Sequence, residues 1–185
     1  MNAHPESILH AAESVVAVLK EFQTEAVVIG ALALAAHHYV RFTEDLDLGM
    51  NASAQKFRAI AEALRARGFH VELREPDADD PLSGVMDVMC PGGLIQLVNF
   101  GQTFPAVIED ALQAPPLTVR PESALRVVPL PHLVALKLYA GGFKSKADVV
   151  ELLRRNTDAD RDEILALCKR YRLRGLPELL EEAGK

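Results

Sequence analysis

The sequence predicts an α/β fold of the α+β kind, a small mixed β-sheet core with flanking helices followed by a helical C-terminal part. Two patterns indicate it: short β-branched or alternating runs lie among helical periods up to about residue 100, and only helical periods remain after residue 125. A chain of 185 residues with 49% hydrophobic and 25% charged residues also has the composition of one compact domain, or of a domain with a helical appendage.

The first predicted elements alternate between helix and strand. Apolar residues at helical spacing predict an amphipathic helix over about residues 5–22. The β-branched run of residues 26–29 predicts a buried strand that stops at Gly30, and the Ala/Leu-rich segment 31–39 predicts a helix directly after this glycine. The period-two alternation of residues 45–50 predicts the next strand.

A second surface helix is predicted over residues 54–67, closed by Gly68 in a C-cap position. Three strands are expected after it, the last two joined by a tight hairpin through Pro91, Gly92 and Gly93; they span residues 69–74, 85–90 and 94–99. The predicted C-terminal helices span residues 131–140, 147–155, 161–171 and 177–182. The prolines between Pro115 and Pro121 interrupt regular structure, so we place the boundary between the core and the helical part there, which gives parts 1–118 and 119–185.

Charge is distributed unevenly along the chain. The formal net charge is −6, residues 1–119 carry 7 Lys/Arg and 16 Asp/Glu, and residues 120–174 carry 12 and 7. This balance excludes a protein that coats DNA through bulk positive charge. The basic stretch 169–174 is either a solvated helix end or one wall of a cleft that binds polyphosphate. With two cysteines, no secretory signal and no membrane-spanning run, we expect a cytoplasmic protein.

The most informative segment is Asp45-Leu46-Asp47. Side chains two residues apart share a face of a strand, so the two carboxylates project together while Leu46 turns to the other face. Close like charges repel unless a proton or a cation lies between them, and carboxylate oxygens suit Mg²⁺ or Mn²⁺. The alternative is an edge strand whose polar face lies in water.

Asp87 lies in a run that is apolar on both sides, Val85-Met86-Asp87-Val88-Met89, which is typical of a buried strand. A buried carboxylate needs a counter-charge, hydrogen bonds or a metal. We expect Asp87 to be a third metal ligand beside Asp45 and Asp47, on a neighbouring strand; three such carboxylates can hold two divalent ions that orient a triphosphate. The alternative is a structural salt bridge or a capped turn.

Several other residues have either a functional or a purely structural interpretation. Gly30, at a strand-to-helix turn fifteen residues before Asp45, is expected to let a phosphate approach the main chain. Lys137 in an apolar helical stretch either balances an anion or reaches to solvent as a surface lysine. The acidic run 77–80 is expected to be solvated or to edge the active-site cleft, and the histidines and cysteines lack zinc-site spacing, so they are expected to be structural.

Taken together, these segments resemble the nucleotidyltransferase superfamily of the DNA polymerase β type. The resemblance rests on Val28–Ala31, on Arg41-Phe42-Thr43-Glu44-Asp45-Leu46-Asp47-Leu48, on Asp87, and on the helical stretches 133–140 and 144–153. More narrowly, the chain is similar to small bacterial nucleotidyltransferase-like proteins that include the abortive-infection (AbiEii) toxins. The resemblance covers about residues 24–155 and implies a nucleotidyltransferase core.

The resemblance implies a role for each matching residue. Asp45, Asp47 and Asp87 would be the catalytic metal ligands, with Mg²⁺ or Mn²⁺ as the cofactor and an NTP as substrate. The residues expected to bind or support the nucleotide are Gly30, Ala31, Arg41, Thr43, Lys137, Lys144 and Asp148. The chain departs from the family pattern at Ala31, where Gly or Ser is usual, and at Ser145, where the first acidic residue of a later motif is expected.

Two functions follow from this resemblance. The first is a metal-dependent nucleotidyltransferase that transfers an NMP to a hydroxyl of an acceptor such as tRNA, a protein or a small molecule, with a toxin–antitoxin role and a cognate antitoxin as partner. The second is a catalytically silent protein of the same fold that binds a nucleotide or a partner, for which Ala31 and Ser145 would be signs of lost activity.

Overall fold

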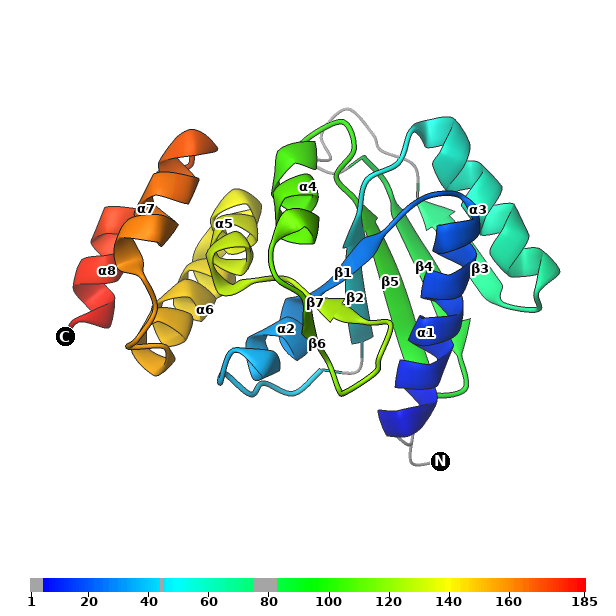
Figure 1. Ribbon diagram of the computed structural model, residues 1–185, viewed down its shortest axis with the longest axis horizontal. Coiled ribbons are helices and arrows are strands. Elements are labelled where there is room, and N and C mark those ends of the chain that lie inside the picture. The colour runs from blue at the N-terminus through cyan, green and yellow to red at the C-terminus, as the bar shows by residue number, and fades with distance from the viewer. Residues whose placement is uncertain (1–4, 44, 75–82) are drawn as a thin grey trace.

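A computed structural model of the protein describes residues 5–43, 45–74 and 83–185, and its sheet and helices confirm the predicted α/β fold (Figure 1). The sheet strands are β1 (Ala26–Ile29), β2 (Asp45–Met50), β3 (His70–Arg74), β4 (Val85–Cys90), β5 (Gly93–Asn99), β6 (Leu117–Thr118) and β7 (Arg126–Val127). The helices are α1 (Pro5–Glu21), α2 (Gly30–Ala36), α3 (Ala54–Ala66), α4 (Pro105–Gln113), α5 (Leu130–Ala140), α6 (Gly142–Arg155), α7 (Arg161–Arg170) and α8 (Leu176–Ala183).

The sheet is mixed and its strands run in the order β3-β4-β5-β2-β1-β7-β6. Strand β2 pairs antiparallel with β1 and parallel with β5, whereas β4 pairs antiparallel with both β3 and β5. The predicted hairpin is present, and β5 rather than β4 is the neighbour of β2. The order therefore places one whole strand between the two segments that carry the candidate carboxylates.

Several details differ from the predicted elements. Helix α2 ends at Ala36 instead of residue 39, because His38 adopts a positive φ of 64° that ends the helical path. Helix α6 begins at Gly142, five residues before its predicted start, and α4, β6 and β7 were not expected. Strand β7 follows the predicted boundary at residues 118 and 119, yet it pairs with β1 in the core sheet.

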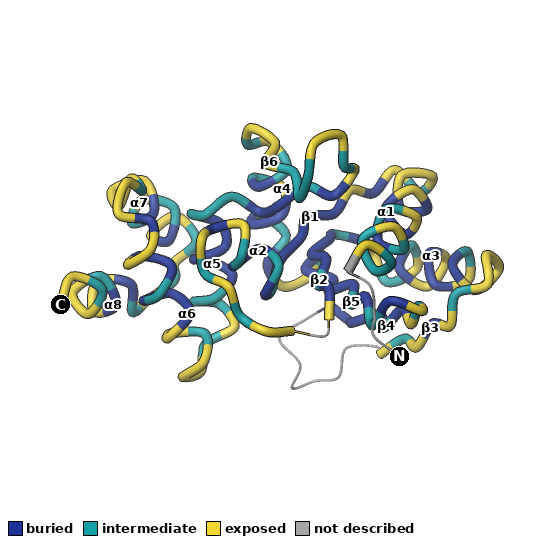
Figure 2. Tube along the Cα trace, turned by 90° about the horizontal axis from the view of Figure 1, so that it is seen from below, coloured by how far each residue is buried: buried dark blue, intermediate teal, exposed yellow. Residues whose placement is uncertain are grey.

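One face of the sheet forms the main core. Its strand residues are almost fully buried, among them Leu46, Leu48, Ile95, Leu97 and Met86. Helices α1 and α3 lie at this face, where α1 contacts β5 and α3 contacts β3. Buried segments run along the strands and the inner sides of the helices, and the outer turns are exposed (Figure 2). This burial explains the period-two alternation of β2, whose carboxylates are on the opposite face.

The C-terminal helices lie beside the core and extend the molecule in one direction (Figure 1). Helix α5 contacts α4, α6 and α7, and α8 contacts α6 and α7. Helix α5 is therefore the element that joins the sheet domain to the last helices. Among the helices of residues 5–43, 45–74 and 83–185, none is long and apolar enough to cross a membrane.

Candidate functional site

A row of polar side chains crosses the sheet on the face opposite the main core. The register pairs Asp47 of β2 with Gln96 of β5, and Gln96 with Asp87 of β4. Residues directly opposite one another on paired strands share a face, so these three side chains project from the same side. Asp45 projects there too, two residues before Asp47 on the same strand.

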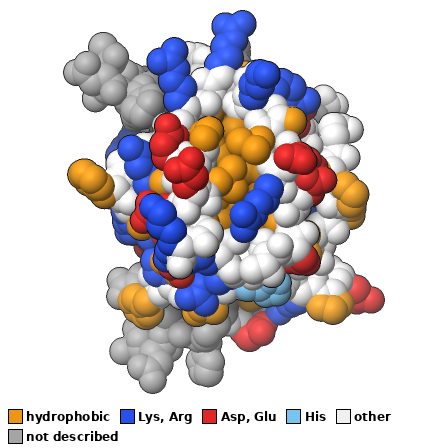
Figure 3. Space-filling view, turned by 90° about the vertical axis from the view of Figure 1, so that its left-hand side faces the viewer, with side chains coloured by type: hydrophobic (Ala, Val, Ile, Leu, Met, Phe, Trp, Pro, Cys, Tyr) orange, Lys and Arg blue, Asp and Glu red, His pale blue; other side chains and the backbone are white. Residues whose placement is uncertain are grey.

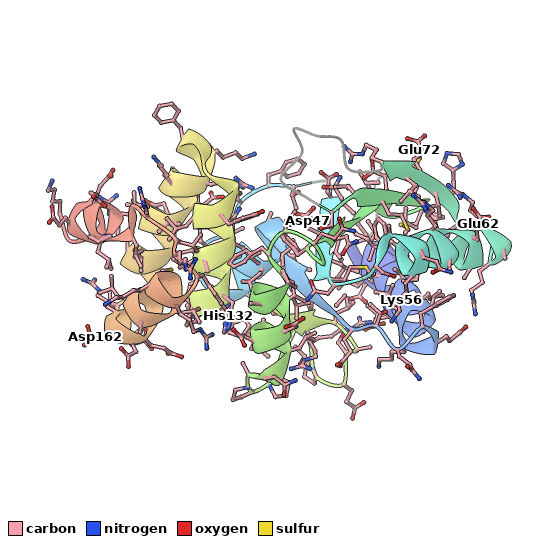
Figure 4. The ribbon with its side chains drawn as sticks, turned by 90° about the horizontal axis from the view of Figure 1, so that it is seen from above. Asp47, Lys56, Glu62, Glu72, His132 and Asp162 are labelled. Atoms are coloured by element: carbon pink, nitrogen blue, oxygen red, sulfur yellow. The ribbon has the colours of Figure 1, made fainter. Side chains whose placement is uncertain are left out.

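Asp45 and Asp47 differ in exposure although they share a face. Asp45 is exposed at the start of β2, whereas Asp47, which is labelled in Figure 4, is half-buried two residues further along the strand. Burial raises the pKa of the Asp47 carboxyl above its ordinary value of 3.8, and the negative charge of Asp45 raises it further; Lys137 and Arg41 act in the opposite direction. Within the described residues no group donates a hydrogen bond to the Asp47 carboxylate, so this charge lacks a direct partner.

Gly30 lies directly against Asp47. It follows β1, whose last residue Ile29 is paired with Asp47, and it begins α2 with a φ of 64°. A Cβ built at position 30 would overlap the Asp47 Oδ2 atom. The glycine is therefore required twice, by its backbone conformation and by the close approach of a carboxylate. The sequence predicts that a phosphate approaches the main chain at Gly30. In the structure, the Asp47 carboxylate lies against the main chain at this position.

Asp87 has partners of its own and does not join Asp45 and Asp47. Gln96 Nε2 donates a hydrogen bond to Asp87 Oδ1 at 2.8 Å, and Arg74 Nη2 forms an ion pair with Asp87 Oδ2 at 2.9 Å. The intervening β5 keeps the Cα atoms of Asp47 and Asp87 two strand spacings apart, about 9–10 Å. The expected three-carboxylate site on neighbouring strands is thus not assembled, and no three His, Cys, Asp or Glu side chains of the described residues are grouped to hold a metal.

A buried ion cluster lies beside this row. Asp148 of α6 is 2% exposed and accepts a hydrogen bond of 2.7 Å from Lys137 Nζ of α5. Arg41, in the segment between α2 and β2, forms an ion pair of 3.3 Å with the same carboxylate. Lys137 therefore does balance an anion, as one of the two sequence interpretations held, but that anion is a protein carboxylate. The cluster ties both helices to the segment that leads into Asp45.

The remaining predicted nucleotide-binding residues differ in how far they are buried. Thr43 accepts a hydrogen bond of 3.3 Å at Oγ1 from the main-chain N–H of Asp45, which supports the start of β2. Ala31 is buried in the first turn of α2, and Lys144 is exposed near the start of α6. Ser145, next to Lys144, is half-buried and lines a cavity.

This cavity of about 270 Å³ lies between the sheet and helices α5 and α6. Gly30 and Lys137 are among its lining residues, and its walls are mostly apolar. The other lining residues are Ile29, Val98, Phe100, Leu133, Leu136, Tyr139, Ala140 and Ser145. Lys137 is the charged side chain among these described residues. The cavity adjoins the carboxylate row because Ile29 is the register partner of Asp47.

The basic stretch 169–174 lies at the end of α7 and the turn before α8, at the far end from the sheet. Figure 3 shows that on this end of the molecule Lys and Arg side chains alternate with Asp and Glu around an apolar centre. Arg170 there forms an ion pair with Asp110 of α4. This face is of mixed charge rather than uniformly basic, which favours the interpretation as a solvated helix end.

The structure gives His37 a structural role: it is buried, and its Nε2–H donates a hydrogen bond of 2.8 Å to the Val128 carbonyl. Cys90 and Cys168 are free thiols, and burial raises the pKa of Cys168 to about 11. The acidic run 77–80 lies outside the described residues.

The sequence did not reveal the roles of Gln96 and Arg74 or the ion pairs of Asp148. A signal was present for Gln96, because it is the one polar residue in the centre of an apolar strand.

Comparisons with known proteins support the fold. No family model matches the chain, and no curated protein matches it by sequence. Among solved structures, the solution structure of the antibiotic-resistance factor ANT(2'')-Ia is similar with a TM-score of 0.54 at 16% identity, over 89% of this chain and 90% of that one. A crystal structure of ANT(2'')-Ia with adenylyl-2''-tobramycin gives 0.53 at 15% identity, over 89% and 96%.

An antigenic nucleotidyltransferase-like protein from Paracoccidioides brasiliensis is similar to the same degree, with a TM-score of 0.53 at 15% identity over 90% of this chain and 88% of that one. At these identities the likeness concerns the fold alone, which is that of nucleotidyltransferases. It agrees with the broader resemblance found in the sequence. The narrower resemblance to abortive-infection toxins stays a prediction.

Proposed function

We propose that the protein is a metal-dependent nucleotidyltransferase that transfers an NMP from an NTP to a hydroxyl group of an acceptor. The observation that carries the proposal is the pair Asp45 and Asp47 on one face of β2, with Asp47 held against Gly30 and without a hydrogen-bond donor in the described residues. The shared fold with nucleotidyltransferases supports the same reaction class.

The carboxylate pair fits a divalent cation. Its oxygen atoms are hard ligands, and burial and the charge of Asp45 raise the pKa of Asp47, an effect that a bound cation would oppose. Asp45 and Asp47 would hold Mg²⁺ or Mn²⁺, which when bound supplies charge neutralisation to the triphosphate. Lys137 and Arg41 are near enough to lower the pKa of Asp47, so positive charge is already directed at the place where phosphates would lie.

The reaction requires no covalent intermediate on the protein. The acceptor hydroxyl oxygen attacks the α-phosphorus, the bond from this phosphorus to the β-bridging oxygen breaks, pyrophosphate leaves, and the hydroxyl proton passes to solvent. The chain supplies position and charge. Gly30, which has no side chain, lets the main chain lie directly against Asp47. Lys137 donates one N–H to Asp148, and its other N–H groups remain for a phosphate. The adjoining apolar cavity would take an uncharged part of a substrate.

One observation favours the second candidate function, a silent nucleotide- or partner-binding module. Asp87 is neutralised by Arg74 and bonded to Gln96, so two carboxylates rather than three face the candidate site. Ala31 stands where the family pattern has Gly or Ser, and it lacks the hydroxyl that Ser would supply, which agrees with this alternative. A toxin role, an antitoxin partner and tRNA or protein as the acceptor rest on the sequence resemblance, and a cytoplasmic location rests on the two free thiols.

Two measurements test the proposal and separate the candidates. Calorimetry with each of the four NTPs, in Mg²⁺ and then in EDTA, measures metal-dependent binding; the double variant Asp45→Asn/Asp47→Asn serves as the matched control. The enzyme and a nucleotide-binding module both predict that wild type binds and that the control does not, whereas a module that binds only a partner predicts binding by neither. Incubation with a labelled NTP and total RNA, protein or small-molecule extracts then measures transfer, which only the enzyme performs. Equal binding by wild type and the double variant would contradict the site assignment.

A further inference from the structure

The side chain beside Asp47 on the next strand is a carboxamide. Gln96 is the direct register partner of Asp47 in the parallel pair β2–β5, so their side chains are neighbours on the same face of the sheet. Asp87 comes one strand later and is the register partner of Gln96. For an ion bound by Asp45 and Asp47 on this face, Gln96 therefore lies one strand away and Asp87 two strands away.

The hydrogen bond between Gln96 and Asp87 fixes which end of the amide faces which neighbour. An ionised carboxylate only accepts, so Gln96 must present its NH₂ group to Asp87, as the 2.8 Å Nε2–Oδ1 distance shows. Arg74 also donates to Asp87 Oδ1, at 3.0 Å, so this oxygen accepts from both the guanidinium and the amide. The amide oxygen Oε1 is then left without a donor from the described residues and is available as an acceptor or a metal ligand.

We propose that Gln96 Oε1 is the third protein ligand at the metal site, and that Asp87 is a positioning residue that acts through Gln96. This inference rests on the proposed function. A neutral amide oxygen is an acceptable ligand for Mg²⁺ or Mn²⁺, and partners that orient a ligand typically contribute strongly to metal affinity. The arrangement places two negative charges at the site instead of three, which suits one divalent ion better than two.

Mn²⁺ alone is the probe, and the free ion is measured by electron paramagnetic resonance with no nucleotide present. The variants are Gln96→Met, which keeps the length and packing of the side chain without its amide, Asp87→Leu, and the double variant. Asp47→Asn tests the site itself, and Glu72→Gln is the matched control, because Glu72 is the exposed register partner of Asp87 on β3. Thermal unfolding of every variant identifies loss of fold.

Gln96→Met is expected to weaken Mn²⁺ binding by roughly 10-fold or more, and Asp87→Leu by roughly 10-fold. In the Gln96→Met background, Asp87→Leu should change the affinity by less than about twofold, because it acts only through the amide. Glu72→Gln should have no effect. A similar loss on Asp87→Leu in both backgrounds would overturn the inference, because Asp87 would then act on the ion independently of Gln96.

The failure of this inference is distinguishable from the failure of the proposed function. If Asp47→Asn abolishes Mn²⁺ binding and Gln96→Met leaves it unchanged, the metal site stands and the role of Gln96 is wrong. If wild type does not bind Mn²⁺, or if Asp47→Asn binds it as wild type does, both the inference and the metal site are wrong. If Gln96→Met unfolds, Gln96→Leu replaces it in the same cycle and is judged by the same outcomes.

Discussion

The Cα of Gly30 lies so close to the Asp47 carboxylate that a Cβ at position 30 would overlap Asp47 Oδ2. The contact joins the first residue of α2 to the centre of β2, and it places a charged group against main chain instead of against a side chain. Such a contact needs both a glycine and a carboxylate of fixed position. It is the local relationship from which the candidate site is built.

Gly30→Ala is expected to destabilise the protein, because alanine meets both the positive φ and the overlap with Asp47. Gly68→Ala is the matched control: Gly68 also has a positive φ, of 87°, but a Cβ there has no atom within 4 Å. We expect about 1 kcal/mol of destabilisation for Gly68→Ala and at least about 2 kcal/mol for Gly30→Ala. Urea denaturation measures both, and equal losses would show that Asp47 is not in contact with position 30.

Asp47→Asn is expected to stabilise the metal-free protein at pH 7. Because burial and Asp45 raise the pKa of Asp47, the folded state holds its proton more tightly than the unfolded state does, and ionisation at higher pH costs stability. The gain from Asn should shrink as pH falls toward 3.8 and vanish below it, where Asp47 is protonated in the folded and the unfolded state alike. Thermal melts in EDTA from pH 4 to 7 measure it; the exposed Asp158→Asn should show no such gain. Destabilisation by Asp47→Asn at pH 7 would contradict this account.

Asp148→Ala is expected to be among the most destabilising single substitutions. It leaves Lys137, whose side chain is 15% exposed, and Arg41 without their shared carboxylate. Breaking a buried ion pair from one side costs about 3–5 kcal/mol, whereas replacing both members by apolar groups costs much less. The double variant Lys137→Met/Asp148→Leu should therefore recover much of the loss in urea denaturation. A loss below about 1 kcal/mol for Asp148→Ala would show that the cluster is not a buried one.

His37 is expected to make stability depend on pH. Burial lowers the pKa of His37 below 6.5, partly offset by its hydrogen bond to the Val128 carbonyl. The unfolded state then binds a proton that the folded state does not, so stability is complete above about pH 6.5 and declines as pH falls toward the folded pKa. Burial lowers the pKa of His132 as well, in the same direction.

Urea denaturation from pH 5 to 8 measures this dependence in wild type, in His37→Gln and in the control His38→Asn. His38 is exposed and has a positive φ that Asn tolerates. His37→Gln should flatten the decline below pH 6.5, whereas His38→Asn should leave most of it, because the charge of His38 is the smallest of the causes that act on the pKa of His37. An unchanged pH slope in His37→Gln would show that His37 does not titrate between the folded and unfolded states in this range.

Local patterns in the sequence were enough to predict much of the fold. The alternation of Asp45–Met50 predicted a strand with two carboxylates on one face, and the structure has it. The hairpin through Gly92 was predicted too, and its register, with Cys90 opposite Gly93, places Asp87 opposite Gln96 by counting back along both strands. Short-range periodicity and turn chemistry decide such features, so they are readable from the chain.

The pairing of strands that are far apart in the chain could not be predicted from local sequence patterns. The parallel pair β2–β5 joins Asp47 to Gln96 across about fifty residues, and nothing in either strand specifies that β5 rather than β4 lies next to β2. For this reason the sequence did not reveal that β5 separates Asp87 from Asp45 and Asp47. One partner of the buried Asp148 is also far away in the chain. Asp148 lies in α6 and Arg41 in the segment between α2 and β2, so only the packed fold brings them together.

The most direct test of the account is the transfer of label from an NTP. Wild type is incubated with Mg²⁺ and NTP labelled either at the α- or at the γ-phosphorus, and Asp47→Asn is treated in parallel. We predict that the α-label becomes bound to an acceptor, that the γ-label leaves in pyrophosphate, and that Asp47→Asn lowers transfer on the order of 100-fold or more. Transfer of the γ-label, or undiminished α-label transfer by Asp47→Asn, would contradict the proposed reaction at this site.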